Sequence, residues 1–78
     1  MIIEVECEVI DRESETSVNK ISVLVNVGNH HSPYGKAEEL ALSELQIKYI
    51  KKRYEISIYN TTEQLNKIGS VFYIDPAD

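Results

Sequence analysis

Apolar and acidic side chains alternate through the first ten residues of the chain. In residues 2–10 the odd positions are apolar and three even positions are acidic: Ile3, Val5, Cys7 and Val9 against Glu4, Glu6 and Glu8. A period of two with β-branched residues is typical of a strand that is buried on one face. Residues 20–27 alternate in the same way and predict a second, antiparallel strand. The polar residues between them, 11–19, predict a long hairpin loop.

A different pattern follows a glycine- and proline-containing stretch at residues 28–35, which we expect to end the second strand. Residues 36–53 predict one long helix. The charges suit the helix dipole, because the first turn would carry Glu38 and Glu39 and the last turn would carry Lys51, Lys52 and Arg53. If the helix begins earlier, Ser32 and Pro33 are suited to be its N-cap and its first residue.

The apolar residues of this helix form two arcs rather than one stripe. The first arc can cover a sheet and contains Ala37, Ala41, Leu42, Leu45 and Tyr49. The second contains Leu40, Ile47 and Ile50 and needs a cover of its own. A chain of 78 residues has little material for that cover, so the second arc indicates self-association.

Alternation returns in residues 54–59, which predict a third strand. In residues 60–69, Thr61 and Gln64 have the spacing of a capping box and Gly69 is suited to end a helix, so we expect a short helical turn or a simple hairpin connection. Residues 70–75 predict a last strand. The whole chain, residues 1–78, is therefore expected to be a single α+β domain, with a small, mainly antiparallel sheet of about four strands in the order strand, strand, helix, strand, strand. The helix should pack on one face of this sheet.

The net charge of −5 arises entirely from the first fifteen residues. They hold six acids and one base, whereas residues 16–78 hold seven acids and seven bases. A surface of one sign is repelled by phosphate and attracted to basic surfaces. The acidic pI, near 4.9, therefore disfavours direct binding to nucleic acid or anionic lipid.

Cysteine usage and hydropathy indicate where the protein is found. Cys7 is the sole cysteine, so an internal disulfide and a cysteine-based metal site are excluded. Small domains without disulfides most often occur in reducing compartments. The acidic start predicts neither a signal nor a transit peptide, and no apolar run has the length of a membrane span. We expect a cytoplasmic protein that does not associate with membranes.

Candidate chemistry is sparse in this sequence. Cys7 is expected to point inward and to be inert, since a nucleophile needs exposure and a neighbouring base. His30 and His31 are adjacent in a polar loop, and two neighbouring histidines rarely bind one metal ion without further ligands. The phosphate-binding spacing of a Walker motif is absent around Gly28, Gly35 and Lys36. We therefore expect no catalysis, no cofactor and no metal.

The leading hypothesis is a non-enzymatic protein-binding module. Its electrostatic contact would come from Glu4, Glu6, Glu8, Asp11, Glu13 and Glu15, and its apolar anchors would be Tyr59 and Tyr73, since tyrosine is enriched in interfaces. In size and charge the chain is similar to small acidic proteins of phages and mobile elements, which block host nucleic-acid machinery by presenting carboxylates to a basic groove. This resemblance implies an inhibitor of a nucleic-acid-handling protein.

Two alternatives remain open. The first is a nucleic-acid-associated module that uses the basic cluster with its interleaved tyrosines, namely Lys48, Lys51, Lys52 and Arg53. The second is a structural subunit that forms homo-oligomers through the second helical arc, Leu40, Ile47 and Ile50.

Overall fold

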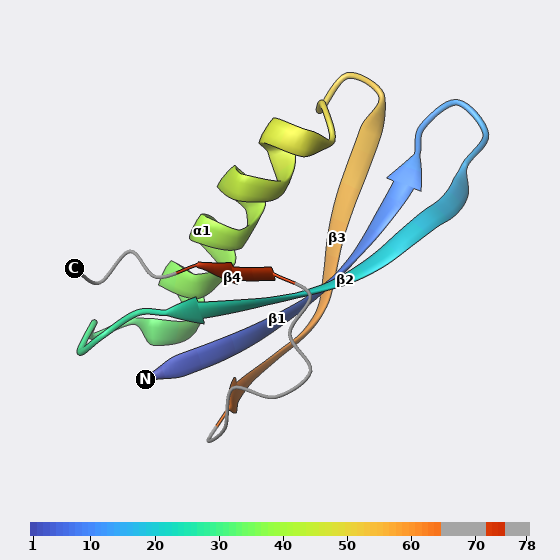
Figure 1. Ribbon diagram of the computed structural model, residues 1–78. Helices are drawn as coiled ribbons and strands as arrows, with labels where there is room; N and C mark the ends of the chain where they lie inside the picture. Colours follow the sequence, from blue (N-terminus) through green and yellow to red (C-terminus); the bar gives the residue numbers. More distant parts are fainter. Residues whose placement is uncertain (65–71, 75–78) are drawn as a thin grey trace.

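The computed structural model describes residues 1–64 and 72–74, which form four strands and one helix (Figure 1). The elements in chain order are β1 (Ile2–Asp11), β2 (Thr16–Asn26), α1 (Pro33–Lys48), β3 (Tyr54–Gln64) and β4 (Phe72–Ile74). The α+β class predicted from the sequence is confirmed.

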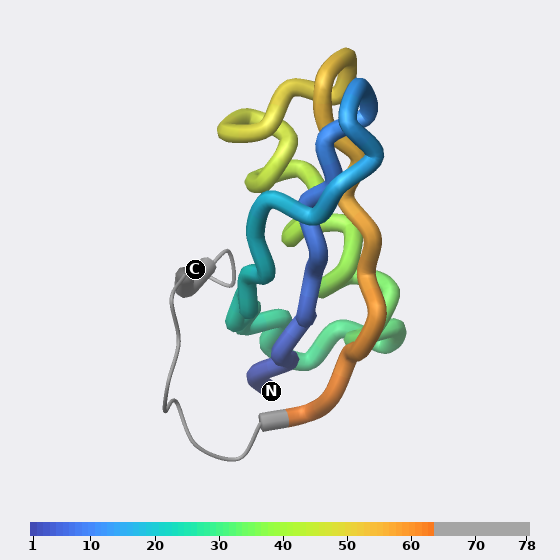
Figure 2. The backbone as a smooth tube through the Cα atoms, turned by 90° about the vertical axis from the view of Figure 1, so that its right-hand side faces the viewer, coloured from blue at the N-terminus to red at the C-terminus, as the bar shows by residue number. Residues whose placement is uncertain are grey.

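The strands form one sheet in the order β3-β1-β2-β4. β1 is central and pairs antiparallel with β2 on one side and with β3 on the other, and Figure 2 shows it between them. β4 pairs parallel with β2 over only three residues. The predicted antiparallel sheet is thus confirmed for three strands. The predicted fourth strand, residues 70–75, is matched only in part, and residues 70, 71 and 75 lie outside the described residues.

The hydrophobic core lies between α1 and one face of the sheet. The odd residues of β1 from Ile3 to Val9 are fully buried there, and they meet alternate residues of β2, such as Val23 and Val25. The helix contributes only Ala37, Ala41 and Leu45 as buried residues. Because two of these three side chains are methyl groups, the helix can approach the strands closely, and Leu45 is the one large helical side chain buried in the core.

The predicted long hairpin loop, residues 11–19, is wrong. β1 extends to Asp11 and β2 begins at Thr16, so that a turn of four residues connects them. Glu15 closes this turn with a left-handed backbone, φ 57°. Residues 16–20 at the start of β2 are all exposed, and four of these five are polar.

Each neighbour of β1 carries one extra residue, which forms a bulge. The pairing steps from Val9–Asn19 to Ile10–Ser17, so Val18 of β2 has no partner on β1. On the other side it steps from Glu6–Asn60 to Cys7–Ile58, and Tyr59 of β3 is the extra residue. Bulges add twist and exclude a side chain from the ladder, and both Val18 and Tyr59 are exposed.

The predicted helix boundaries, 36–53, are wrong at both ends. Ser32 and Pro33 do begin the helix, so the first turn contains no acid, and Glu38 and Glu39 lie in the second turn. The helix ends at Lys48, and residues 51–53 form the turn that follows it. Continuing the helix would place Lys51 and Lys52 three and four residues after Lys48 on one face, where like charges repel.

The predicted helical turn that begins at Thr61 is also wrong, because β3 continues to Gln64. Thr61 pairs with Val5 of β1, and its hydroxyl donates a hydrogen bond of 2.6 Å to the Glu38 carboxylate of α1. Cross-strand pairing and this contact with the helix therefore override the local capping pattern. The remainder of the predicted turn, residues 65–69, lies outside the described residues.

Candidate functional site

The glutamates of β1 lie on the sheet face opposite α1, which we call the open face. Glu4, Glu6 and Glu8 alternate with the buried residues of the core and are each partly exposed. Successive carboxylates on one face of a strand are about 7 Å apart, since each residue rises about 3.3 Å. Figure 2 views the sheet from this side, with α1 behind it. The sequence pattern predicted this placement correctly.

The neighbouring strands add charges to the open face. On β3, the Nδ2 of Asn60 donates a hydrogen bond of 2.6 Å to Glu6 Oε2, and Glu55 lies opposite Ile10. On β2, Lys20 lies opposite Glu8. Among the residues that the structure describes, four carboxylates and one ammonium group therefore share this face. Alternation in residues 54–59 places Glu55 on a polar side of its strand, but only the strand order shows that this side adjoins the glutamates of β1.

Asp11, the first acid of the hairpin, is separated from the open face. Asp11 is on the α1 side of the sheet, and its carboxylate accepts hydrogen bonds from the backbone N–H groups of Glu13 at 2.9 Å and Ser14 at 3.4 Å. It also pairs with Arg53 at 3.5 Å. The first of these backbone bonds is the largest cause that holds the pKa of Asp11 below its ordinary value. Asp11 therefore supports the turn, where Glu13 and the exposed Glu15 lie.

We expect Asp11→Ala to lower the urea midpoint of unfolding at pH 7, since the turn loses its acceptor. Asp11→Asn, which keeps an acceptor oxygen but not the charge, should lose less. The lowered pKa means that the charged carboxylate stabilises the fold above its ordinary pKa of 3.8, and that this contribution is lost as the pH falls through the folded value. Wild type and Asp11→Asn should therefore converge in urea midpoint as the pH falls from 5 to 2.5. A difference that stays constant over this range would contradict the role of the charge.

The two candidate tyrosines occupy opposite edges of the sheet. Tyr59 lies at the bulge of edge strand β3 and is 55% exposed. Tyr73 lies in β4, where its Cα neighbour is Leu24 of β2, and its side chain is outside the described part of the chain. Because β1 and β2 separate β3 from β4, the fold does not bring the two tyrosines together.

In the folded protein, Arg12, which is distant in sequence, lies beside the basic cluster. Lys48 ends α1, with its ammonium 5.9 Å from the Tyr49 ring centre, and Lys51, Lys52 and Arg53 form the turn before β3. Arg12 of the hairpin joins them: its backbone N–H donates to Arg53 O at 2.9 Å, and its Nε donates to Lys51 O, also at 2.9 Å. No feature of the sequence links Arg12 to a turn about forty residues away, so sequence reasoning missed it.

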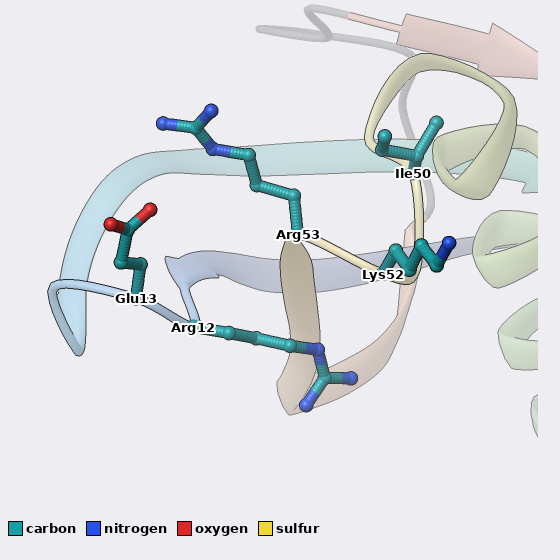
Figure 3. A pocket seen from close by; sticks show the side chains of 5 residues that line it. All are labelled: Arg12, Glu13, Ile50, Lys52 and Arg53. Carbon is teal, nitrogen blue, oxygen red and sulfur yellow. The ribbon is translucent and has the colours of Figure 1, made fainter.

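A hollow of about 320 Å³ lies where the hairpin meets this turn, and Arg12, Glu13, Ile50, Lys52 and Arg53 line it (Figure 3). Arg53 reaches toward the hairpin, whereas Arg12 extends in the other direction, below the turn. The cationic groups therefore leave the hollow in different directions.

Only two of the three residues of the helical arc proposed for self-association are exposed to solvent. Leu40 is half-buried and packs against the core. Ile47 of α1 is 78% exposed, and Ile50, in the turn beyond the helix, is 58% exposed. The surface that remains for an oligomer contact on this side is two separate isoleucines.

Cys7 lies in the core, and the two histidines stack against each other in the loop before α1. Cys7 is fully buried, and burial, with a smaller contribution from the negative charge of Glu38, raises the pKa of its thiol to about 11. The rings of His30 and His31 stack at 4.6 Å, and His30 Nδ1 accepts a hydrogen bond from Ser32 N–H. Within residues 1–64 and 72–74, no group of three His, Cys, Asp or Glu residues could hold a metal ion. Over the same described residues, no helix is long and apolar enough to cross a membrane.

In comparisons with known proteins, no family model, curated protein or solved structure matches this chain.

Proposed function

We propose that this protein is a non-enzymatic binding module whose open face docks on a positively charged surface of a partner protein. The observation that carries the proposal is the presence of four carboxylates, those of Glu4, Glu6, Glu8 and Glu55, against one ammonium group among the described residues of the sheet face that α1 leaves uncovered. Three of the four belong to the central strand, which is held by a neighbour on each side.

The rigidity of the strand favours binding of this kind. Carboxylates that are already positioned lose little conformational freedom when a partner binds, and a surface of one sign steers a basic partner toward it. Tyr59, exposed at the adjacent edge of β3, would supply an apolar anchor. The basic surface of a nucleic-acid-handling protein is the partner that this charge fits best, so we propose an inhibitory role in the cytoplasm.

The proposal is tested by affinity capture from a nuclease-treated lysate of the native host. The test variant carries Glu4→Gln, Glu6→Gln and Glu8→Gln, which remove charge while leaving an acceptor for Asn60 at position 6. We expect wild type to retain a basic protein at low salt, and the variant to retain at least tenfold less of it. The same loss should occur for wild type when the salt concentration is raised, because exposed charges are screened.

A matched control removes three charges from the helix side. Glu39, Glu44 and Glu63 are exposed, the first two on α1 and the third opposite Ile3 on the core side of β3. Their triple glutamine variant has the same net charge as the test variant and should capture as well as wild type. Equal capture by all three folded proteins, judged folded by circular dichroism, would refute the role of the open face.

A further inference from the structure

Strand β3 lies at the edge of the sheet and has a free side. In the order β3-β1-β2-β4 it is an outer strand, and among the described residues it pairs only with β1. Figure 2 shows it in orange along one margin of the sheet. Natural proteins often protect such a strand from further pairing with lysine, proline or a bulge. The segment 54–58, which we call the free edge, contains neither lysine nor proline, and the bulge at Tyr59 comes after it.

The hydrogen bonds of the neighbouring turn show which main-chain groups of the free edge point outward. The N–H of Arg12 donates to the carbonyl oxygen of Arg53 at 2.9 Å, so Arg53 directs its main chain toward the β1 hairpin. In an antiparallel pair this direction alternates from one residue to the next. Glu55 and Ser57 therefore direct their main-chain groups toward β1. The residues that direct theirs to the free side are Tyr54, Ile56 and Ile58.

The main-chain bond of Tyr54 agrees with this orientation. Its N–H donates to the carbonyl oxygen of Ile50 in the turn, at 2.9 Å, and not to β1. The N–H groups of Ile56 and Ile58 and the carbonyls of Tyr54 and Ile56 point to the side where no described strand pairs with β3. A strand added on this side would be held by main-chain hydrogen bonds, as in β-augmentation generally.

The side chains of the free edge are complementary to a second copy of the same segment. When two copies pair antiparallel about Ile56, residue 54 lies opposite residue 58, and residue 55 lies opposite residue 57. The side toward α1 then holds only apolar pairs, Tyr54 with Ile58 and Ile56 with its counterpart. On the open face each Glu55 is opposite Ser57, and the two Glu55 side chains are only diagonal neighbours. A centre at residue 55 would put these carboxylates directly opposite each other, and a centre at residue 57 would run into the bulge.

A hollow of about 150 Å³ lies along the free edge, where an apolar side chain of the second copy can enter. Leu42 of α1 and Tyr54 and Ile56 of β3 give it apolar surface. Polar residues line the rest of it: Arg12, Gln46, Lys51 and Glu55. Because Leu42 belongs to the helix and Glu55 to the open face, the hollow lies at the edge of the sheet and not over one face. In the pairing centred on Ile56, Ile58 of the second copy lies opposite Tyr54 and faces this hollow.

We propose that two copies of this chain pair through the free edge into a symmetric dimer. The two Ile56 residues exchange their N–H and C=O groups, and each Ile58 N–H donates to the Tyr54 carbonyl of the other copy. These three side chains pack against the core but are only half-buried in one copy, and the second copy covers them, which stabilises the pair. The two-fold axis is perpendicular to the sheet, so both helices cover the same side and the two open faces adjoin. The dimer contact does not depend on what the open face binds.

The dimer is tested by sedimentation equilibrium of the purified protein at concentrations up to about 500 µM. We expect wild type to form dimers. Ser57→Glu places like charges directly opposite each other in the dimer, so it should weaken association at least tenfold. The double variant Glu55→Lys, Ser57→Lys should weaken it in the same way, because its lysines oppose each other. An equimolar mixture of these two variants should associate at least as strongly as wild type, since each carboxylate at the junction then faces an ammonium group.

Ser22→Glu is the matched control, because it adds the same charge to the open face on β2, away from β3. Ser22 lies opposite Glu6 and Ser57 lies opposite Glu8, so both variants place a carboxylate beside a glutamate of β1. The control should change association less than twofold.

Three results, obtained with variants that circular dichroism shows to be folded, would overturn the inference. They are a wild type that is monomeric at 500 µM, equal weakening by Ser57→Glu and Ser22→Glu, and a mixture of the charge-swapped variants that stays monomeric. The triple variant Glu4→Gln, Glu6→Gln, Glu8→Gln should dimerise at least as well as wild type. Failure of the open-face proposal would therefore leave the dimer unchanged, and a monomer that still captures a basic protein would overturn only the dimer.

Discussion

Replacing Leu45 by alanine should lower the free energy of unfolding by about 2–4 kcal/mol, the usual cost of emptying a packed leucine position in a core. Leu45 is 2% exposed, and the other two buried residues of α1, Ala37 and Ala41, are already the size of a methyl group. No other large helical side chain in the described structure is equally buried. A small domain has modest stability, so the loss should be visible as a large decrease in the urea midpoint.

Ile47→Ala is the matched control, because it removes a side chain of similar size from the same helix at a position that is 78% exposed. Its effect should stay within about 0.5 kcal/mol, as is usual for surface substitutions. If Ile47→Ala were as costly as Leu45→Ala, the exposed isoleucine would be covered in solution, and the packing described here would have to be revised.

Alkaline pH should destabilise the fold through Cys7. The thiol has an ordinary pKa of 9.0 and is raised to about 11 in the folded protein, first by burial and then by the charge of Glu38. Above pH 9 the unfolded state therefore loses its thiol proton while the folded state keeps it. Because the unfolded state then binds fewer protons, stability falls as the pH rises. A shift of this size corresponds to about 2 kcal/mol lost between pH 8 and pH 10.5.

The variant Cys7→Ala isolates this effect, since every other ionisable group is common to the two proteins. At pH 8 wild type should be the more stable of the two, because alanine leaves a small cavity. By pH 10.5 the difference in unfolding free energy, measured by urea titration, should have moved by about 2 kcal/mol in favour of the variant. A difference that does not change with pH would mean that Cys7 is accessible to solvent, and rapid reaction of the native thiol with Ellman's reagent would show this directly.

Alternation in the sequence determined which side chains of the two N-terminal strands point inward. From Ile3 to Val9, each odd residue predicted to be buried is buried, and the glutamates between them are on the open face. This succeeds because the two faces of a strand differ strongly in their free energy of transfer from water, so a period of two is decisive wherever one face is covered. The predicted helix start at residue 36 was wrong, although the earlier start at Ser32 and Pro33 could be recognised as an alternative, because proline is favoured at the first position of a helix.

The ends of the strands were decided by contacts between segments that are distant in sequence. β2 begins four residues earlier than predicted because polar residues can extend a ladder beyond the core, and β3 continues through Thr61 because pairing with β1 outweighs a local capping pattern. The helix ends early, at Lys48, although no glycine or proline follows it. In the two strands a local preference of about 1 kcal/mol or less competes with cross-strand pairing and loses, whereas the helix ends where further turns would bring like charges together.

The sequence by itself determined that the chain forms an α+β fold and that its glutamates line one face of a strand, because burial of apolar side chains specifies both. Only the tertiary structure decided how the charges are grouped. It placed Asp11 on the α1 side of the sheet, added Glu55 to the open face, and brought Arg12 to the turn at Arg53. The physical reason is that strand order and turn contacts juxtapose residues about forty positions apart, and no periodicity in the chain encodes which segments become neighbours.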